Sequence, residues 1–390
     1  MIEQSPFAPD FVQNPYPAYD EMREAGPLFY WKDYGFLCSA EHATVNALLR
    51  DRRFASELPG DLAPEVPPHL RQFYAFESRS ILAIEPPGHT RIRALLTRAF
   101  TTRRINAMAP QVRALSKELV AQFPDQAFDL LPAFAEVIPV TIICRLLGVP
   151  EEMAPQLLKW SHDMVAIYQA RRDRALEERT EAATIAFMEY INGFVAKRRK
   201  APRDDLISEL ISAKDQGEKL TEEELITTCI LLLNAGHEAT VHGISNGVKT
   251  LLQTGARFGA DEKQNLKIIE ETIRFDPPLH MFTRYALQDL RVAGHDFKRG
   301  EQVGLLLAAA NRDPAVFANP GAFIPARNNA RQLAFGAGLH FCIGAPLARM
   351  EMLNSMPALF AACPDLALAE KPIYTNSYHF HGLERLMVTR

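Results

Sequence analysis

The spacing of apolar residues divides the chain into helical and strand-like stretches. Apolar side chains recur every three or four positions through much of the segment between Gly88 and Ile211, which predicts a series of amphipathic helices. The clearest of these helices cover 105–123, 134–147, 153–168 and 183–200. Aromatic-rich, alternating or short apolar runs predict strands over 28–37, 283–307 and 373–388. The pattern therefore predicts a mainly helical fold with a small β part.

Local signals mark where other helices begin and end. Such helices are predicted over 14–23, 41–50, 221–252 and 262–274. Thr221 and Glu224 form a capping box at the start of the long apolar helix. Pro277 and Pro278 end the following helix, because the residue before a proline is driven out of helical conformation.

Composition and charge narrow the class of protein. The chain has 390 residues, of which 47% are hydrophobic and 23% charged, with a net charge of −4. This is typical of a globular protein with a large core and gives no reason to expect a nucleic-acid partner. We find no linker or repeat and predict a single domain over 1–390. The polar, proline-broken segment 1–27 predicts neither a signal peptide nor a membrane anchor, so we expect a cytoplasmic protein.

The cysteines are odd in number, scattered and without CxxC spacing, which argues against a disulfide framework or a zinc site. They are Cys38, Cys144, Cys229, Cys342 and Cys363. Cys342 differs from the others because it lies in a glycine-punctuated loop, FGAGLHFCIG over 335–344, followed by a predicted helix with Pro346 in its first turn.

The Cys342 loop has the features of a thiolate site. Glycines let the backbone turn tightly, so that N–H groups can point at the sulfur, and the helix N-terminus beyond adds partial positive charge. Both effects favour a thiolate, which is a strong ligand for haem iron. A buried structural cysteine is the alternative.

The spacing FGxGxHxCxG in this loop is matched at every fixed position and resembles the haem-binding loop of the cytochrome P450 superfamily. The resemblance extends from Asn14 to the C-terminus. It implies a mainly α cytochrome P450 fold, a haem b cofactor and Cys342 as the thiolate ligand of the iron. It also implies that Phe335 and Gly344 contact the haem.

Four basic residues match positions where this family holds the haem propionates. His89 and Arg93 lie four residues apart, in a segment that resembles the early helix over the haem, and share one helix face. Arg284 follows a later helix, and His340 lies two residues before the cysteine. The resemblance implies propionate binding by all four; the alternative is that each is an ordinary core or surface residue.

Glu271 and Arg274 form an ExxR pair on one helix face. Most such pairs are surface ion pairs that contribute little. Here the following prolines strengthen the likeness to the superfamily's ExxR helix, and Arg327 matches the third member of its network. The resemblance implies a structural role for Glu271, Arg274 and Arg327 in holding the haem-loop region.

The stretch AGHEAT over 235–240 resembles the family's oxygen-binding segment. It implies that Gly236 lets the helix approach the haem and that Glu238 helps to carry protons. The family's next residue is usually a threonine whose hydroxyl assists dioxygen activation, but this chain has Ala239. Thr240 lies about 100° further round the helix and is a poor direct replacement. The proton route is therefore expected to use the substrate or ordered water.

A proline-rich segment, 57–69, predicts a long loop, and the resemblance implies that this region covers the substrate. Candidate substrate contacts follow this loop or lie at other positions that match the family. They are Phe73, Phe76, Ile81, Leu82, Asn234, Ala235, Leu279, His280, Met281, His379 and Phe380. The aromatic and aliphatic members could equally be core residues, and the polar ones could bond backbone or water.

The resemblance implies a haem-thiolate monooxygenase that inserts one oxygen atom from O2 into a small or medium apolar substrate. No flavin or iron–sulfur motif is present, so electrons are expected from NAD(P)H through a reductase and a ferredoxin or flavodoxin-type partner. We expect a monomer. Desaturation or ring coupling by the same haem chemistry, and a haem-binding sensor without turnover, are the alternatives.

Overall fold

The structure is a computed structural model that describes residues 1–168, 172–214, 217–327, 331–378 and 380–390. Its α-helices are α1 (Pro9–Gln13), α2 (Tyr16–Glu24), α3 (His42–Arg50), α4 (Arg71–Glu77), α5 (Gly88–Ala99), α6 (Thr102–Ala107), α7 (Ala109–Ala121), α8 (Val137–Leu147), α9 (Ala154–Val165), α10 (Arg174–Lys200), α11 (Leu206–Ser212), α12 (Glu222–Thr254), α13 (Glu262–Phe275), α14 (Leu307–Ala310) and α15 (Ala345–Ala362). Short 3-10 or π turns are η1 (Pro68–Leu70), η2 (Leu131–Ala135), η3 (Glu151–Met153), η4 (Ala166–Tyr168) and η5 (Gly338–His340).

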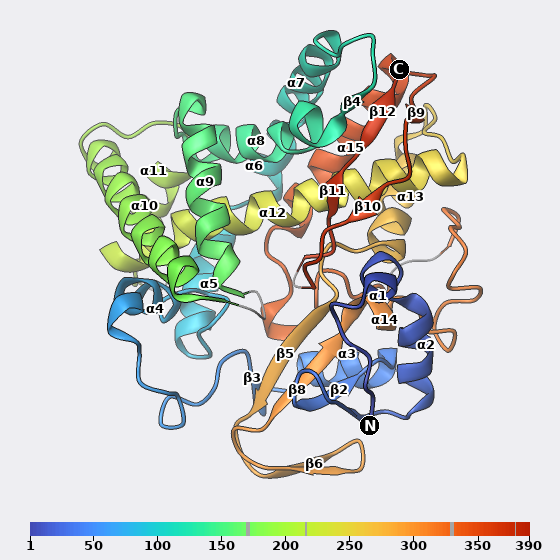
Figure 1. The fold of residues 1–390 in the computed structure, drawn as a ribbon. Helices are drawn as coiled ribbons and strands as arrows, with labels where there is room; N and C mark the ends of the chain where they lie inside the picture. Colours follow the sequence, from blue (N-terminus) through green and yellow to red (C-terminus); the bar gives the residue numbers. More distant parts are fainter. Residues whose placement is uncertain (169–171, 215–216, 328–330, 379) are drawn as a thin grey trace.

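Within the described residues the strands form four small sheets; in Figure 1 the strands of the largest lie below α12, and β9 and β12 lie beside α15 near the C-terminus. They are β1 (Phe29–Trp31), β2 (Phe36–Ser39), β3 (Phe54–Ala55), β4 (Phe128–Asp129), β5 (Met281–Ala286), β6 (Leu290–Val292), β7 (His295–Phe297), β8 (Gln302–Leu306), β9 (Ala367–Leu368), β10 (Ile373–Tyr374), β11 (Leu383–Arg385) and β12 (Met387–Thr389). The largest sheet has the order β1-β2-β8-β5-β3, in which β2 and β8 are parallel. Smaller sheets pair β4-β12-β9, β10-β11 and β6-β7.

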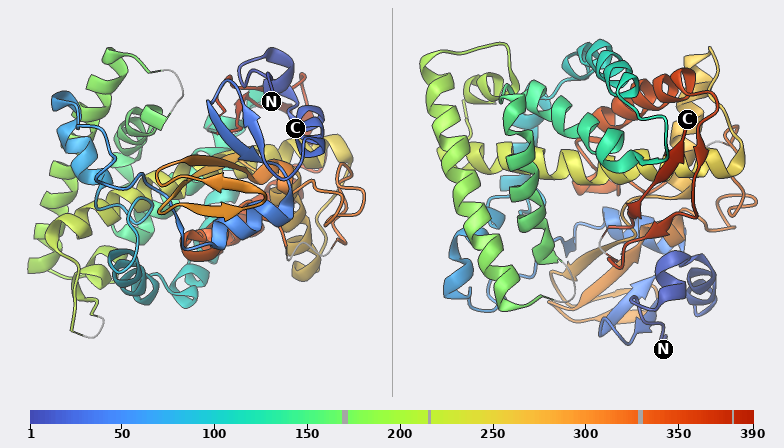
Figure 2. Two further views of the ribbon diagram at one scale, coloured as in Figure 1. Left: turned by 90° about the horizontal axis from the view of Figure 1, so that it is seen from below. Right: turned by 45° about the horizontal axis from the view of Figure 1, so that its top comes forward.

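Helix α12 is the axis of the helical part and crosses it from one side to the other (Figure 2). The predicted capping box is present: Thr221 accepts from the backbone of Glu224, whose side chain accepts from Thr221 N–H. Gly255, with φ of 73°, ends the helix in the left-handed conformation that favours glycine. Helices α8, α9, α10 and α15 pack against α12. In the part of the chain that the structure describes, no helix is both long and apolar enough to cross a bilayer.

The predicted mainly helical architecture with a small β part is confirmed, and the differences are local. The single periodic stretch over 105–123 is two helices, because Met108 separates α6 from α7 and Pro110 lies in the first turn of α7. The short helices α1 and α4 were not predicted from the sequence, since neither is long enough to show a helical period.

Candidate active site

The loop that carries Cys342 folds as a tight cradle around the sulfur. Gly336 and Gly338 have φ of 69° and 71°, which a side chain would strain. The backbone N–H of Cys342 donates to Phe335 O at 3.0 Å. The backbone N–H groups of Gly344 and Ala345 point at the sulfur. A Cβ on Gly344 would lie 3.7 Å from Cys342 Sγ, so this residue packs directly beside the sulfur.

The pKa of the Cys342 thiol is raised, whereas the loop sequence predicted a thiolate. Burial raises the pKa of the Cys342 thiol, and the N–H groups with Arg349 and Arg93 offset this only in part. The loop therefore does not by itself lower the pKa of this thiol, whereas a metal cation at the sulfur would favour the thiolate. The other four cysteines are buried, whereas Cys342 is partly accessible.

The four predicted propionate residues lie close to one another beside this loop. The rings of His89 and His340 have centroids 4.6 Å apart. Arg93 donates to Phe341 O at 2.8 Å, so α5 is tied to the cysteine loop. Arg284, on β5, lies within electrostatic reach of Glu85, whose carboxylate contacts His340 Nε2 at 3.0 Å. A hollow of about 410 Å³ opens next to His89, Arg93 and Leu339.

The side chains of this basic cluster fit a dicarboxylate such as haem. Both ring nitrogens of His89 are buried without a hydrogen-bond partner among the described residues. Burial lowers the pKa of His89 to about 4 and also lowers the pKa values of Arg93 and Arg284. A buried cation loses less stability when an anion is near it. Glu85 alone cannot balance all of these groups, so the cluster has donors in excess for two further carboxylates.

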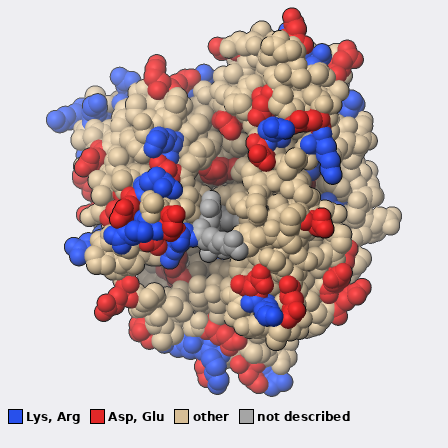
Figure 3. All heavy atoms as spheres, viewed as in Figure 1, with Lys and Arg blue, Asp and Glu red and all other residues tan. Residues whose placement is uncertain are grey.

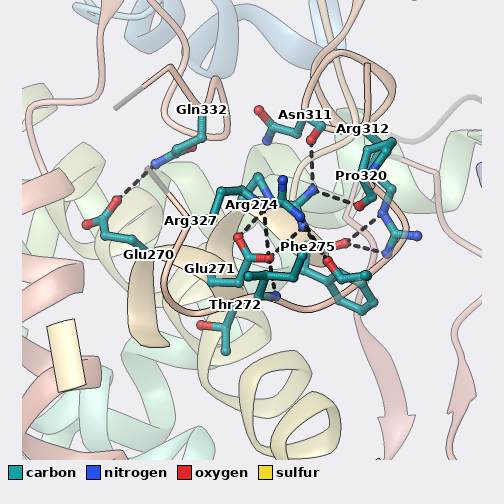
Figure 4. Close-up of polar contacts among 12 residues, drawn as sticks. Glu270, Glu271, Thr272, Arg274, Phe275, Asn311, Arg312, Pro320, Arg327 and Gln332 are labelled. Atoms are coloured by element: carbon teal, nitrogen blue, oxygen red, sulfur yellow. Dashed lines mark hydrogen bonds and ion pairs between the residues drawn. The ribbon is translucent and has the colours of Figure 1, made fainter. Parts of the chain in front are cut away.

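Glu271 and Arg274 of α13 form a closed polar network (Figure 4). Both side chains are fully buried, and Arg274 Nε and Nη2 each donate to a Glu271 oxygen at 2.8 Å. Arg274 also donates to the carbonyls of Asn311 and Pro320 at 2.9 and 3.0 Å. Arg327 Nε reaches Glu271 Oε1 at 3.4 Å. The network thus fixes the segment that leads into the cysteine loop to α13.

On α12, the predicted oxygen-binding stretch presents small residues to open space. Ala235 is exposed and Gly236 and Ala239 are partly exposed, while the flanking positions of this long helix are buried. Thr240 donates its hydroxyl to Gly236 O at 3.1 Å, which is a bond within the helix itself. Thr240 is therefore already engaged, and the helix offers no free hydroxyl at Ala239.

Glu238, the predicted proton-carrying acid, lies against two histidines. His162 Nε2, from α9, is 3.0 Å from Glu238 Oε1, and His237 Nδ1 is 3.7 Å from the same oxygen. Burial would raise the pKa of Glu238, but the two imidazoles outweigh it and hold that pKa below its usual value. Glu238 is thus a carboxylate with basic neighbours on both sides.

The substrate candidates separate into different environments. Phe73, Phe76 and Ile81 are buried in the main hydrophobic core, whereas Leu82 is 54% exposed. Leu279, Met281 and Phe380 are partly exposed, and His379 lies outside the described residues.

Two polar candidates, Asn234 and His280, are buried in separate places. Asn234 bonds Met164 Sδ of α9 at 3.7 Å, and its carbonyl oxygen has no hydrogen-bond partner in the described part of the chain. His280 instead accepts from or donates to Tyr19 OH at 2.8 Å, which places it with α2. Figure 3 shows the molecule from the side drawn in Figure 1. This face is hollowed near its centre, between α9 and α10 on one side and the C-terminal strands on the other.

The sequence model of the family described as "Cytochrome P450" matches residues 59–254 and 266–362. The chain belongs to the cytochrome P450 family. Between these two matched stretches, residues 255–265 cover the connection after α12 and the first turn of α13.

Curated relatives and solved structures agree with this P450 assignment. The chain is 33% identical to "Biotin biosynthesis cytochrome P450" of Bacillus subtilis, covering 100% of this chain and 99% of the relative. It is 34% identical to "Vitamin D(3) 25-hydroxylase" of Pseudonocardia autotrophica, over 98% and 95% of the two chains. The crystal structure of P450BioI with an acyl carrier protein bearing hexadec-9Z-enoic acid superposes with a TM-score of 0.91, at 32% identity over 98% and 99%.

Family membership identifies the chain as an oxidoreductase of the P450 monooxygenase class with a thiolate-ligated haem. Two residues of the site were missed in the sequence. Glu85 precedes α5 and contacts His340, which is far away in the sequence, so no local pattern pointed to it. His162 is far from Glu238 in the sequence, and no local pattern connects them.

Proposed function

We propose that this P450 inserts one oxygen atom from O2 into a small or medium-sized, mainly apolar substrate. The main support for this proposal is the Cys342 loop, in which backbone N–H groups point at a partly accessible sulfur beside four basic side chains. Bound haem supplies the binding and reductive activation of dioxygen. Cys342 would hold the iron, with Phe335 and Gly344 against the ring, while His89, Arg93, Arg284 and His340 would hold the propionates.

The α12 residues act on the opposite side of the site. Gly236 and Ala239 leave space for dioxygen and substrate, because neither has a long side chain. The carboxylate of Glu238 would accept a proton near that space, and the hydroxyl of Thr240 stays bonded to Gly236 O. Asn234 Oδ1 is a buried acceptor that a substrate hydroxyl can bond. These features favour a substrate with one polar group on an apolar body.

Electrons are proposed to come from NAD(P)H through a reductase and a ferredoxin-type partner. Of the arginines that could attract an acidic partner, Arg104 is paired with Asp204 and Glu209, and Arg349 with Glu270. These pairs reduce the net positive charge of the surface, so docking by charge would rest on other exposed arginines, such as Arg103 and Arg331. Electron-transfer rates should fall with salt as the Debye length shrinks from about 10 Å at 0.1 M to about 3 Å at 1 M.

The assignment is tested by spectrum and by product. Reduced, carbon monoxide-treated protein should have the red-shifted Soret band of thiolate ligation, and Cys342→His should lose it, whereas Cys363→Ser should keep it. Steroids, terpenoids, aromatic acids and fatty acids, free or carrier-linked, are then screened with a ferredoxin system. A product that carries one labelled oxygen from O2 supports the proposal. Thiolate ligation without any NAD(P)H-dependent product, or only products that lose two hydrogens, would contradict it.

A further inference from the structure

Three potential metal-binding side chains meet where α9 packs on α12. His162 projects from α9, and His237 and Glu238 project from consecutive positions of α12. One ligand atom from each residue lies within 4.8 Å of the others. His162 Nε2 and His237 Nδ1 are 3.0 and 3.7 Å from Glu238 Oε1. Tetrahedral zinc with bonds of about 2.0–2.1 Å places its ligand atoms about 3.3 Å apart, which is between these two distances.

Hydrogen bonding does not account for this arrangement. Glu238 Oε1 has no hydrogen-bond partner among the described residues, although His162 Nε2 is within hydrogen-bonding distance. The atoms are therefore close but not aligned for donation. His237 is 2% exposed, and neither of its ring nitrogens has a partner in the described part of the chain. A buried imidazole without partners is costly, so its nitrogens are available to bind a ligand.

Charge and access both favour a dication. Glu136 lies within electrostatic reach of His162 and His237 and adds a second carboxylate to the surroundings. The His162 side chain is 56% exposed, so an ion can enter from solvent while His237 and Glu238 remain buried. Two imidazole nitrogens and one carboxylate oxygen suit zinc and its transition-metal neighbours better than Mg²⁺ or Ca²⁺, which prefer oxygen ligands.

A second cluster of the same residue types lacks these properties. Asp276, His280 and His381 are also within 4.8 Å of one another, but all three are buried. Lys249 Nζ bonds Asp276 Oδ2 at 2.5 Å, which places an ammonium group where a metal ion would have to bind. His280 is further engaged by Tyr19. The second cluster is therefore already neutralised, and only the α9–α12 cluster is open to a cation.

We propose that His162, His237 and Glu238 form a zinc-type transition-metal site that links α9 to α12. A bound ion would join α9 to α12, which already pack against each other, and would hold the carboxylate of Glu238. Because Glu238 is also the acid proposed to serve proton transfer, an ion at this site inhibits turnover. The site thus makes the enzyme sensitive to free zinc.

The binding test uses Zn²⁺ alone with untagged, haem-loaded protein that has been treated with chelator. Titration calorimetry should give one zinc per chain for the wild type. His162→Ala should weaken binding by roughly 100-fold or more, since it removes one of three ligands. His162→Cys should retain tight binding, because a thiolate replaces the imidazole. Zinc-edge absorption should report nitrogen and oxygen neighbours at about 2.0–2.1 Å in the wild type.

The matched control is His295→Ala, which removes another histidine–glutamate contact, His295 Nε2 to Glu301 Oε1 at 2.8 Å, from β7. This variant should bind zinc as the wild type does. Zinc should lower product formation in the wild type and in His295→Ala but not in His162→Ala. Equal zinc affinity in the wild type and His162→Ala would overturn the site, whether or not the protein turns over a substrate.

Discussion

Two buried glutamates of this P450, Glu271 on α13 and Glu238 on α12, have opposite surroundings. Each oxygen of Glu271 accepts an aligned bond from Arg274, and the same arginine is held by backbone carbonyls. Glu238 has basic neighbours at similar distances, but its Oε1 has no aligned donor among the described residues. A saturated carboxylate holds the fold in place, whereas an unsaturated one can exchange protons or bind an ion.

The largest effect is expected from Glu271→Gln. The substitution leaves the Arg274 cation buried without its carboxylate, which typically costs about 3–5 kcal/mol. We expect a drop of that size in the free energy of unfolding and a loss of haem content, measured by denaturant titration and absorbance. Glu270→Gln, which removes the charge that pairs with the partly exposed Arg349, should cost less, about 1 kcal/mol. Equal costs for the two variants would show that the Glu271 network is not structural.

The second-largest loss of stability is expected from Lys249→Met. Lys249 and Tyr374 both bond Asp276 Oδ2 at the end of α13, and burial alone would raise the pKa of Asp276. Without the ammonium group the carboxylate loses its main countercharge, at a cost of about 3 kcal/mol. Thermal unfolding at neutral pH measures the loss. Asp276→Asn combined with Lys249→Met should recover part of it, and a double variant as unstable as the sum of the singles would contradict this pairing.

Ala239→Thr tests whether the substrate supplies the missing hydroxyl. A hydrogen bond to developing charge is typically worth about 10²–10³ in rate. We expect the variant to raise product formed per NAD(P)H, by roughly tenfold, for a substrate analogue that lacks its polar group, and to change coupling little for the intact substrate. Thr240→Val should have a small effect, because that hydroxyl bonds Gly236 O. Equal coupling in all combinations would sink the substrate-assisted route.

The smallest effect is a pH dependence of the contact between His162 and Glu238. The neighbouring Glu238 raises the pKa of His162 above 6.5, so the stabilising contribution is complete below 6.5 and is lost as pH rises through the raised value. Glu238 has a lowered pKa and keeps its contribution until the pH falls well below 4.5.

In metal-free buffer, His162→Ala should therefore destabilise the protein more at pH 6 than at pH 9. The difference should be at most about 1 kcal/mol, because His162 is half-exposed. Urea unfolding of both proteins at the two pH values measures it. A larger loss at pH 9 would contradict the assigned protonation states.

The features that could be predicted from the sequence are those formed by residues close together in the chain. The capping box at Thr221, the ExxR spacing of Glu271 and Arg274, and the loop around Cys342 are all contained within a few residues. The approach of His162 to Glu238 could not be predicted, since it depends on how α9 packs across α12. The same holds for His280, whose partner Tyr19 belongs to the N-terminal helix α2.

The cysteine loop rests on the backbone of α3, near the other end of the chain. A Cβ on Gly338 would lie 2.5 Å from Leu49 O, so only glycine allows this approach. Similarly, β2 pairs with β8, and the last strand, β12, pairs with β4. During synthesis the N-terminal part emerges first and must wait for these partners. Haem capture is therefore a late event in the maturation of the chain, after the ribosome has released the cysteine loop.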